Sequence, residues 1–445
     1  MLSDGQAFGE YHDGLRRVMA RANRYRPAAG QAYRSECRAQ NGVSMRLPAD
    51  DHTGARIADY RKLRHLTQEA LAQRAYLSRS CIAKVERGLA PATPAVVAAV
   101  ARVLQVDVAV LNGQPYTSEM QQDHLDLMIA PLSDALDLYD LGPDPDITPR
   151  SLADIEPDVR ALCEKACATE YSGVGQQLPG LLGELTTAIS LLPEGEERRR
   201  TAAALSWCYW VAYEFAYRLG YHLLASIALE RMGWTAEQAQ DPLLLAVRLS
   251  RRSAMLLRRG DNRMSLRTLD RAHRLVGQHD APGSVPALAV SGSLHLAAAI
   301  AAAQAKAPDA VAGHMELARQ VAKEIGRDVP QVYWAAFGET NVRHFDVATR
   351  VELGQLGDAV RAAQALHFPA EHPRMRVGRY YIEMARAYTE MGRAEAAQRA
   401  LSQARTVAPQ QARYHPLVRE TIGALVRRQR RAAEGLTSLA AWVGM

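Results

Sequence analysis

The stretch from Leu66 to Gly88 constrains the fold of this 445-residue chain more than any other part of it. Thr67 and Ser78 are residue types that cap helix N-termini, and apolar residues follow each of them at helical spacing. Gly88 comes after the second periodic segment, in a position where glycine ends a helix. The stretch therefore predicts two short helices joined by a tight turn.

This stretch resembles the lambda-repressor-like (Xre-type) helix-turn-helix DNA-binding domain. The motifs that carry the resemblance are an arginine in the first helix, Thr-Gln-Glu-x-Leu-Ala, Ser-x-x-x-Ile and Glu-Arg-Gly, at Arg61, 67–72, 78–82 and 86–88. The resemblance implies a five-helix domain over residues 53–113, with the second helix of the pair in the major groove. The alternative is a helical hairpin of a larger bundle.

We expect helices at Ala55–Arg64, Gln68–Ala75, Arg79–Arg87 and from Thr93-Pro94 to Leu104, with a last turn at Val108–Leu111. The first helix should turn Ile57, Tyr60 and Leu63 inward. His65 and Tyr76 stand at helix ends where members of the family usually carry glycine. If the backbone is left-handed there, each residue costs about 1 kcal/mol.

The resemblance also implies which residues contact DNA. Arg79, Ser80 and Lys84 fall on the positions that face bases, and an arginine can bond the O6/N7 edge of guanine through two hydrogen bonds. Gln68 and Ser78 fall on phosphate-contacting positions at helix N-termini, and Arg87 is a further candidate. Arg61 and Glu86 should form a structural ion pair in the interior. Each exposed basic residue could instead be a solvated surface charge.

The distribution of charge supports contact with a polyanion. The chain has a net charge of +6, and residues 53–112 hold nine Lys/Arg against four Asp/Glu, or +5. Such segregation suits phosphate contact. Residues 1–50 add +3 and contain many arginines, with little periodicity. They are either a basic arm on DNA or, as we favour because Met45 lies just before the domain, a non-native extension; disorder is expected in both cases.

The remaining chain predicts an all-α protein. Residues 114–150 are expected to form a linker, with a helix from Glu119 to about Leu141 and a proline-rich break at Gly142–Pro149. Residues 151–445 are expected to form helix pairs. Tyr381–Pro409 fits the tetratricopeptide (TPR) spacing, and degenerate copies have their turns at Gly260, Lys306 and Gly354. Stacked pairs would form an α-solenoid with a concave surface.

Segments 337–342, 351–354 and 408–420 resemble actinobacterial Xre-type regulators with TPR-like regions. In that region Asn341 could clamp a peptide backbone, with His344 close by, as Asn does in TPR-based pheromone receptors. Alternatively Asn341 caps a helix that begins near Val342. An aromatic stripe at Trp210, Tyr213, Tyr217 and Tyr221 is explained by packing between helices or, less simply, by a ligand cage.

No signature of an enzyme or metal site is present in the sequence, so we expect no catalysis, no cofactor and no metal. The cysteines form no Cys-x-x-Cys pair and should be buried reduced thiols. No signal segment and no apolar run of about 18 residues is evident, which favours a cytoplasmic protein without a membrane partner.

These features together predict a sequence-specific transcriptional regulator. Its partners would be double-stranded DNA, a second copy in a homodimer, and a peptide or small-molecule effector bound to the TPR-like region. The main alternative is a TPR protein-interaction scaffold with a vestigial helix-turn-helix. An unrecognised enzyme on the solenoid would need a pocket of clustered His and carboxylates.

Overall fold

The computed structural model describes residues 52–116, 124–281, 283–428 and 434–445. Within these ranges the regular secondary structure is helical, and β-pairing is limited to a single bridge between Val329 and Phe337. The predictions for residues 1–50, including Met45 as the start, concern a segment outside the described residues. The all-α expectation is confirmed for the part of the chain that the structure describes.

Residues 53–113 form five helices close to the predicted bounds, with their own apolar core around Ile57, Leu71, Ile82 and Leu104. The expectation that Leu63 faces inward is wrong, because its side chain is 66% exposed at the end of the first helix. The helices are α3 (Thr53–Leu63), α4 (Gln68–Ala75), α5 (Arg79–Glu86), α6 (Pro94–Leu104) and α7 (Val108–Asn112).

The single helix expected from Glu119 to Leu141 is wrong. His124 has a φ of 57°, and a left-handed residue interrupts a right-handed helix. The described part of this segment is a 3-10 turn, η2 (Asp126–Met128), followed by α9 (Ile129–Asp137). Leu125, Leu132 and Leu136 are fully buried against the following helices, so this segment belongs to the core of the helical body.

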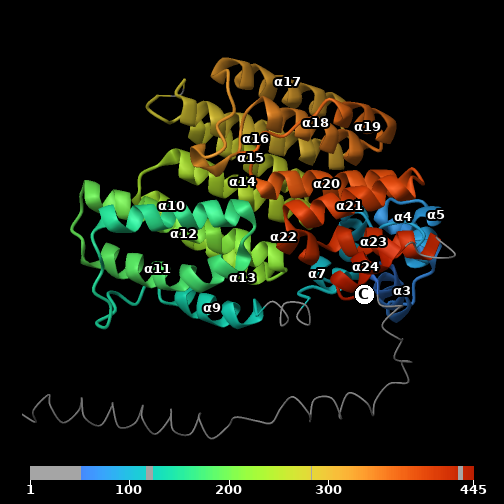
Figure 1. Ribbon diagram of the computed structural model, residues 1–445, viewed down its shortest axis with the longest axis horizontal. Coiled ribbons are helices and arrows are strands. Elements are labelled where there is room, and N and C mark those ends of the chain that lie inside the picture. The colour runs from blue at the N-terminus through green and yellow to red at the C-terminus, as the bar shows by residue number, and fades with distance from the viewer. Residues whose placement is uncertain (1–51, 117–123, 282, 429–433) are drawn as a thin grey trace, which may run out of the picture. The chain divides into compact units, whose positions relative to one another are not determined.

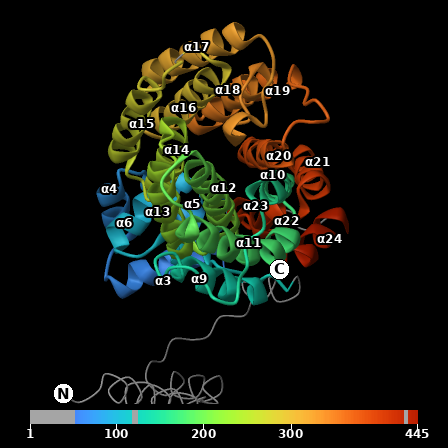
Figure 2. The same ribbon diagram turned by 90° about the vertical axis from the view of Figure 1, so that its left-hand side faces the viewer.

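Residues 152–445 fold as successive antiparallel helices, and in Figure 2 the pairs from α12 to α21 follow an arc. Figure 1 shows the last helices, α20 to α24, beside the five-helix domain. The first half of this body contains α10 (Leu152–Ala168), α11 (Tyr171–Leu191), α12 (Glu196–Leu219), α13 (His222–Gln238), α14 (Pro242–Arg258) and α15 (Asn262–Val276). The second half contains α16 (Val285–Gln304), α17 (Pro308–Ile325), η3 (Val332–Trp334), α18 (Glu339–Leu353), α19 (Leu356–Gln364), α20 (Arg374–Glu390), α21 (Ala394–Val407), α22 (Pro409–Tyr414), α23 (Pro416–Arg428) and α24 (Glu434–Trp442).

The predicted turn positions are where the backbone reverses between paired helices. Gly260, Lys306, Gly354 and Gly392 all have a φ between 58° and 83°, and they join α14 to α15, α16 to α17, α18 to α19 and α20 to α21. In the last pair, Ala385, Ala397 and Ala404 are fully buried where the helices touch. The body is therefore a series of helical repeats consistent with a solenoid.

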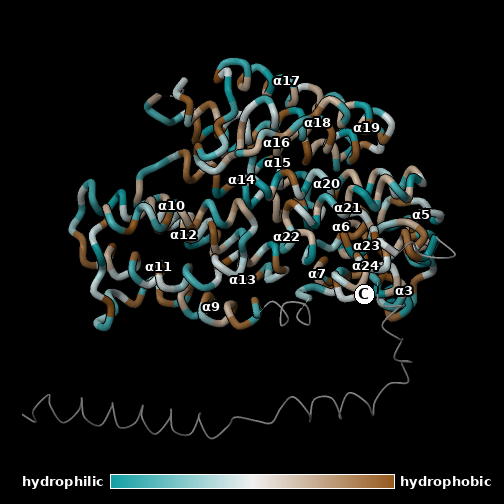
Figure 3. The backbone as a smooth tube through the Cα atoms, viewed as in Figure 1, coloured by the Kyte–Doolittle hydropathy of each residue, from teal (hydrophilic) through white to brown (hydrophobic). Residues whose placement is uncertain are grey.

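The expectation that no apolar run reaches the length of a membrane span did not take account of α16. α16 is long and apolar enough to span a membrane, with a mean hydropathy of 1.7 over the 18-residue window, but 56% of that window is buried inside the fold. Its small residues, such as Ala298 and Ala302, pack against neighbouring helices. Hydrophobic and hydrophilic residues alternate along most other helices (Figure 3), which is the pattern of helices with one buried face.

The five-helix domain is bonded to the body at several points. Arg427 Nε donates to the Gly88 carbonyl oxygen at 2.8 Å, and Arg428 donates to the Leu89 carbonyl oxygen. The backbone N–H of Thr53 donates to the buried carboxylate of Glu420 at 3.0 Å. These contacts tie both the start of α3 and the end of α5 to α23.

Candidate functional site

The turn between α4 and α5 is three residues long and closed by local hydrogen bonds. Tyr76 is left-handed, with a φ of 55°, and its N–H bonds back to the carbonyls of Ala72 and Gln73. Ser78 then caps α5, because its hydroxyl oxygen accepts a hydrogen bond from the N–H of Cys81. His65, with a φ of 53°, is the second non-glycine residue at a left-handed helix end that the sequence singled out.

An ion pair inside the domain fixes the relative positions of its helices. Arg61 Nε donates to Glu86 Oε1 at 2.6 Å and its Nη2 donates to Oε2 at 3.0 Å, with the Arg61 and Glu86 side chains 12% and 5% exposed. The hydrogen bond to Glu86 raises the pKa of the Arg61 guanidinium. Gln68 Nε2 donates to Glu86 Oε2 at 2.8 Å, which leaves its second amide hydrogen for another acceptor.

The side chains assigned to DNA contact lie together on and beside α5, at the surface. The side chains of Arg79 and Lys84 form no hydrogen bond or ion pair with any residue that the structure describes. Arg87 Nε donates to the Ala83 carbonyl oxygen at 3.1 Å, and its two terminal amino groups form no hydrogen bond or ion pair with a residue that the structure describes. The exposed members of the set are Ser78, Arg79, Ser80, Lys84 and Arg87, while Gln68 is half-buried. Docking on the body thus leaves this surface open.

The described cysteines are free thiols, and the described residues contain no cluster of side chains that could hold a metal ion. Cys163, Cys167 and Cys208 are free and buried, Cys81 is free and half-buried, and Cys37 lies outside the described part. Burial raises the pKa of the Cys163, Cys167 and Cys208 thiols, that of Cys167 to about 12. A thiol held protonated in this way is neither a nucleophile nor a metal ligand at neutral pH.

Asn341 does not cap a helix. α18 begins at Glu339 with Gly338 at the N-cap, so the amide of Asn341 lies in the first turn, 1% exposed. Neither its nitrogen nor its oxygen has a hydrogen-bond partner among the described residues. His344, one turn later, has its Nε2 at 3.6 Å from Glu383 Oε2 and lines a cavity between the five-helix domain and the body. The role of these two residues in ligand binding stays a prediction.

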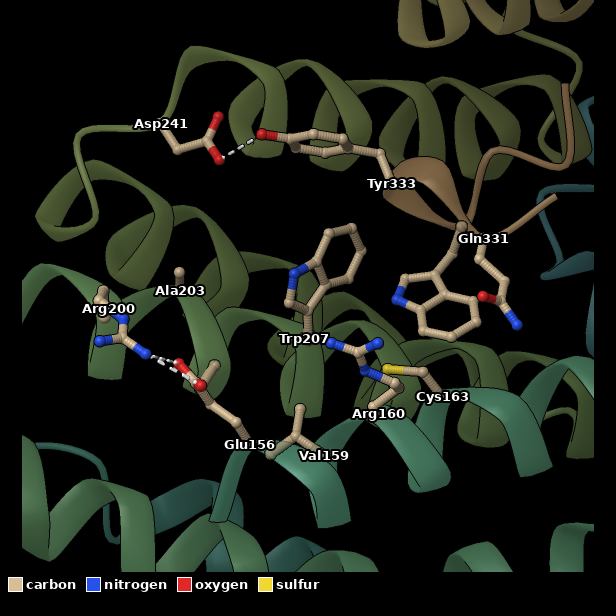
Figure 4. Close-up of a pocket in the computed structure, with 12 residues that line it drawn as sticks. Glu156, Val159, Arg160, Cys163, Arg200, Ala203, Trp207, Asp241, Gln331 and Tyr333 are labelled. Atoms are coloured by element: carbon tan, nitrogen blue, oxygen red, sulfur yellow. Dashed lines mark hydrogen bonds and ion pairs between the residues drawn. The ribbon is translucent and has the colours of Figure 1, made fainter. Parts of the chain in front are cut away.

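A pocket of about 530 Å³ opens between α10, α12 and the segment around η3 (Figure 4). Figure 4 shows the Trp207 indole at its centre, with Tyr333 reaching over from η3. The Tyr333 hydroxyl donates to Asp241 Oδ2 at 2.7 Å, and its ring lies 5.8 Å from that of Trp207. Arg200 and Glu156 form an ion pair at the rim.

Tyr333, Trp334 and Ala336 hold φ angles of 48°, 48° and 53°, a backbone region that costs each non-glycine residue about 1–3 kcal/mol. Ring contacts offset this strain, since Trp334 stacks on Trp210 at 6.3 Å. The aromatic stripe of α12 therefore packs between elements, as expected for Trp210 and Tyr213, which are almost fully buried. Its partners on η3 were not found from the sequence because the contact spans more than 120 residues of chain.

Comparison with known proteins identifies the N-terminal domain. Residues 57–111 match the family model described as helix-turn-helix, which includes α4, α5 and every residue assigned to DNA contact. No curated protein and no solved structure matches the chain. The helix-turn-helix assignment therefore applies to this domain and is independent of the helical body.

Proposed function

We propose that this protein is a sequence-specific transcriptional regulator that reads an operator with α5. The observation that carries the proposal is the exposed, unpaired state of Arg79 and Lys84 on a helix that the helix-turn-helix match covers. Arg79 would bond a guanine edge in the major groove, and Lys84 would donate one turn further on. Gln68, Ser78 and Arg87 would hold the phosphates, helped by the free N–H groups at the start of α5.

The helical body would serve dimerisation and the sensing of a peptide or small molecule in the cytoplasm. Such regulators bind two half-sites about one helical turn apart, so a change in the spacing of the two recognition helices changes affinity. The bonds that involve Arg427, Arg428 and Glu420 support this coupling, because they join α23 to the end of α5 and to the start of α3 and would carry a movement of α23 to the DNA-reading helix. A TPR scaffold with a vestigial helix-turn-helix is the rival, and an open DNA-contacting surface would be unnecessary for it.

The test is fluorescence anisotropy of the full chain on duplexes tiled from the region upstream of its own gene, over a salt series. We expect tight binding to one segment. Arg79→Ala should lose about 1–3 kcal/mol on that segment and relax the preference for one base pair. Arg87→Ala should weaken binding to all duplexes alike and lower the salt slope by about 1.

Arg361→Ala is the matched control, since Arg361 is an exposed arginine on α19, far along the chain from α5. It should leave both affinity and salt slope unchanged. If every duplex binds weakly and equally, a selection of bound fragments from the whole genome distinguishes an operator elsewhere from the scaffold alternative. An empty selection would reject the regulator and favour the scaffold.

A further inference from the structure

A second cavity, of about 320 Å³, lies where the DNA-binding domain meets the body. Ala92, Pro94 and Val97, around the start of α6, form the wall on the side of the domain. Val108 and Asn112 of α7, with Gln114, also line it, and residues of α12, α13, α14, α16, α18, α20, α22 and α23 form most of the rest. We call this space the central cavity. Its volume is in the range of small-molecule sites and equals about ten water molecules at ~30 Å³ each.

Positive charge exceeds negative charge in one part of the central cavity. Arg218 and Arg251 both pair with the single carboxylate of Glu214, at 3.0 and 3.2 Å. Arg376, also in the wall, forms no ion pair with any carboxylate of the described residues, and its Nε is buried without a hydrogen-bond partner. Three guanidinium groups therefore share one carboxylate, which is 5% exposed.

The excess of positive charge affects the pKa of Arg376. Burial, together with the nearby Arg251, lowers the pKa of its guanidinium to about 10. His415 in the same wall is affected in the same way, since burial and then Arg379 and Arg218 hold its pKa well below the usual range. An anion between these cations would remove their mutual repulsion.

A buried amide in the same wall also lacks partners. Gln411 on α22 is 2% exposed, and neither its Oε1 nor its Nε2 has a hydrogen-bond partner among the residues that the structure describes. Leaving such a group unpaired costs about 1–3 kcal/mol, so buried amides are normally satisfied. The wall also contains the apolar side chains of Tyr213, Phe345 and Met375. Its two other carboxylates, Glu383 and Glu352, are each paired with an arginine, Arg379 and Arg386 respectively.

We propose that the central cavity binds a small organic anion, a carboxylate or phosphate ester on an apolar body, with Arg376 and Arg251 holding the anionic group and Gln411 bonding its polar neighbour. Pro94 and Val97 of the DNA-binding domain line the same cavity, so an anion whose apolar body fills the cavity would contact that domain. Its assignment as the effector rests on the proposed regulatory function, whereas its binding does not.

The binding test measures the melting temperature of the full chain in a buffer free of phosphate. Inorganic phosphate tests the anionic group alone, while phenyl phosphate and benzoate add an apolar body and distinguish the two headgroups. At saturation we expect a rise of about 2–4 °C. At least one of the two phenyl compounds should bind ten-fold or more tightly than phosphate. Benzyl alcohol and benzylamine, which carry no negative charge, should give no rise.

Arg376→Gln should weaken anion binding at least ten-fold while leaving the melting temperature without anion equal or higher, because it removes an unpaired buried charge. Arg361→Gln, on an exposed arginine, is the control and should respond as the wild type does. If Arg376→Gln does not fold, Arg251→Gln repeats the comparison. Equal shifts in wild type and variants, or no shift with any of the three anions, would overturn the proposal.

Hydrogen exchange separates this proposal from the regulatory one. With the anion bound, peptides that cover residues 92–104 should exchange their amide hydrogens more slowly in the wild type. In Arg376→Gln the exchange rate of these peptides should not change when the anion is added. This result requires no DNA, so a failure to find an operator leaves it intact. Conversely, operator binding in a chain that binds no anion would reject the effector site alone. Unchanged exchange in an anion-bound chain would reject the contact with the domain.

Discussion

Arg427 donates from Nε to the carbonyl oxygen of Gly88 at 2.8 Å, across 339 residues of chain. Gly88 directly follows the helix that we assign to base reading, and its φ of 66° is left-handed. A Cβ on Gly88 would lie 2.1 Å from Arg427 Nε, so only glycine allows this approach. The C-terminal part of the body thus holds the end of α5 through a charged hydrogen bond.

Arg427→Ala should loosen the DNA-binding domain from the body. A hydrogen bond to a charged group contributes about 1.5–3 kcal/mol, and we expect the lower part of that range because the contact is partly exposed. Hydrogen exchange should rise in peptides that cover residues 79–90 and stay unchanged at α12. Arg399→Ala, on a largely exposed arginine, is the control. Unaltered exchange at 79–90 would show that other contacts suffice to hold α5.

Glu86→Ala should destabilise the DNA-binding domain strongly. The change leaves the Arg61 guanidinium, 12% exposed, without its carboxylate and removes the acceptor of Gln68. Breaking a buried pair from one side costs about 3–5 kcal/mol. Urea unfolding followed by circular dichroism measures the loss. The double variant Arg61→Met with Glu86→Leu should recover most of it, and a double variant as unstable as the single one would show that the pair is not the cause.

Tyr76→Gly should stabilise the domain by about 0.5–1 kcal/mol. Tyr76 is 93% exposed, so no packing is lost, and its φ of 55° costs a side-chain-bearing residue more than glycine loses in chain entropy. Gln73→Gly, in the interior of the same helix, should instead lose about 1 kcal/mol. Urea titrations of both variants should therefore give changes in the free energy of unfolding of opposite sign. A loss in both variants would mean that the left-handed turn is not strained in the folded chain.

Local signals made the DNA-binding domain predictable. Thr67, Ser78 and Thr93 each accept a hydrogen bond from an N–H in the first turn of the helix that they precede. Capping of this kind depends on a few neighbouring residues, so the sequence alone locates α4, α5 and α6. The turn positions at Gly260 and Gly392 were found for the same reason, since both are left-handed and need little side-chain context.

Long-range contacts could not be predicted in this way. Nothing near Arg376 in sequence shows that Arg251 and Glu214 lie beside it, because three separate helices bring them together. The segment around Tyr333 has no periodic pattern, and its position on α12 depends on ring contacts with Trp207 and Trp210. The alternative that Asn341 caps a helix was wrong for a local reason, because the helix begins two residues before it, at Glu339.

A pH titration should show that partly buried histidines limit the stability of the fold in mild acid. Burial lowers the pKa of His273 and His295 to about 4, and that of His222 to about 3. These rings stay neutral in the folded chain, while in the unfolded chain they take up protons below about pH 6.5. The unfolded state then binds more protons, so stability is fully present above pH 6.5 and falls as the pH drops toward 4.

Each such histidine lowers the free energy of unfolding by up to about 1.4 kcal/mol per pH unit in this window, and by less where solvent screens it. Glu383, whose pKa the Arg379 guanidinium helps to hold at about 2, acts in a separate window below about pH 4.5. The rings of His273 and His295 lie 4.3 Å apart, so protonating both in the fold is doubly unfavourable. His295→Gln should therefore flatten the decline between pH 6.5 and 4.5, measured by urea unfolding at each pH. The exposed His367→Gln should leave the slope as in the wild type, and an equally steep decline in both variants would reject the assignment.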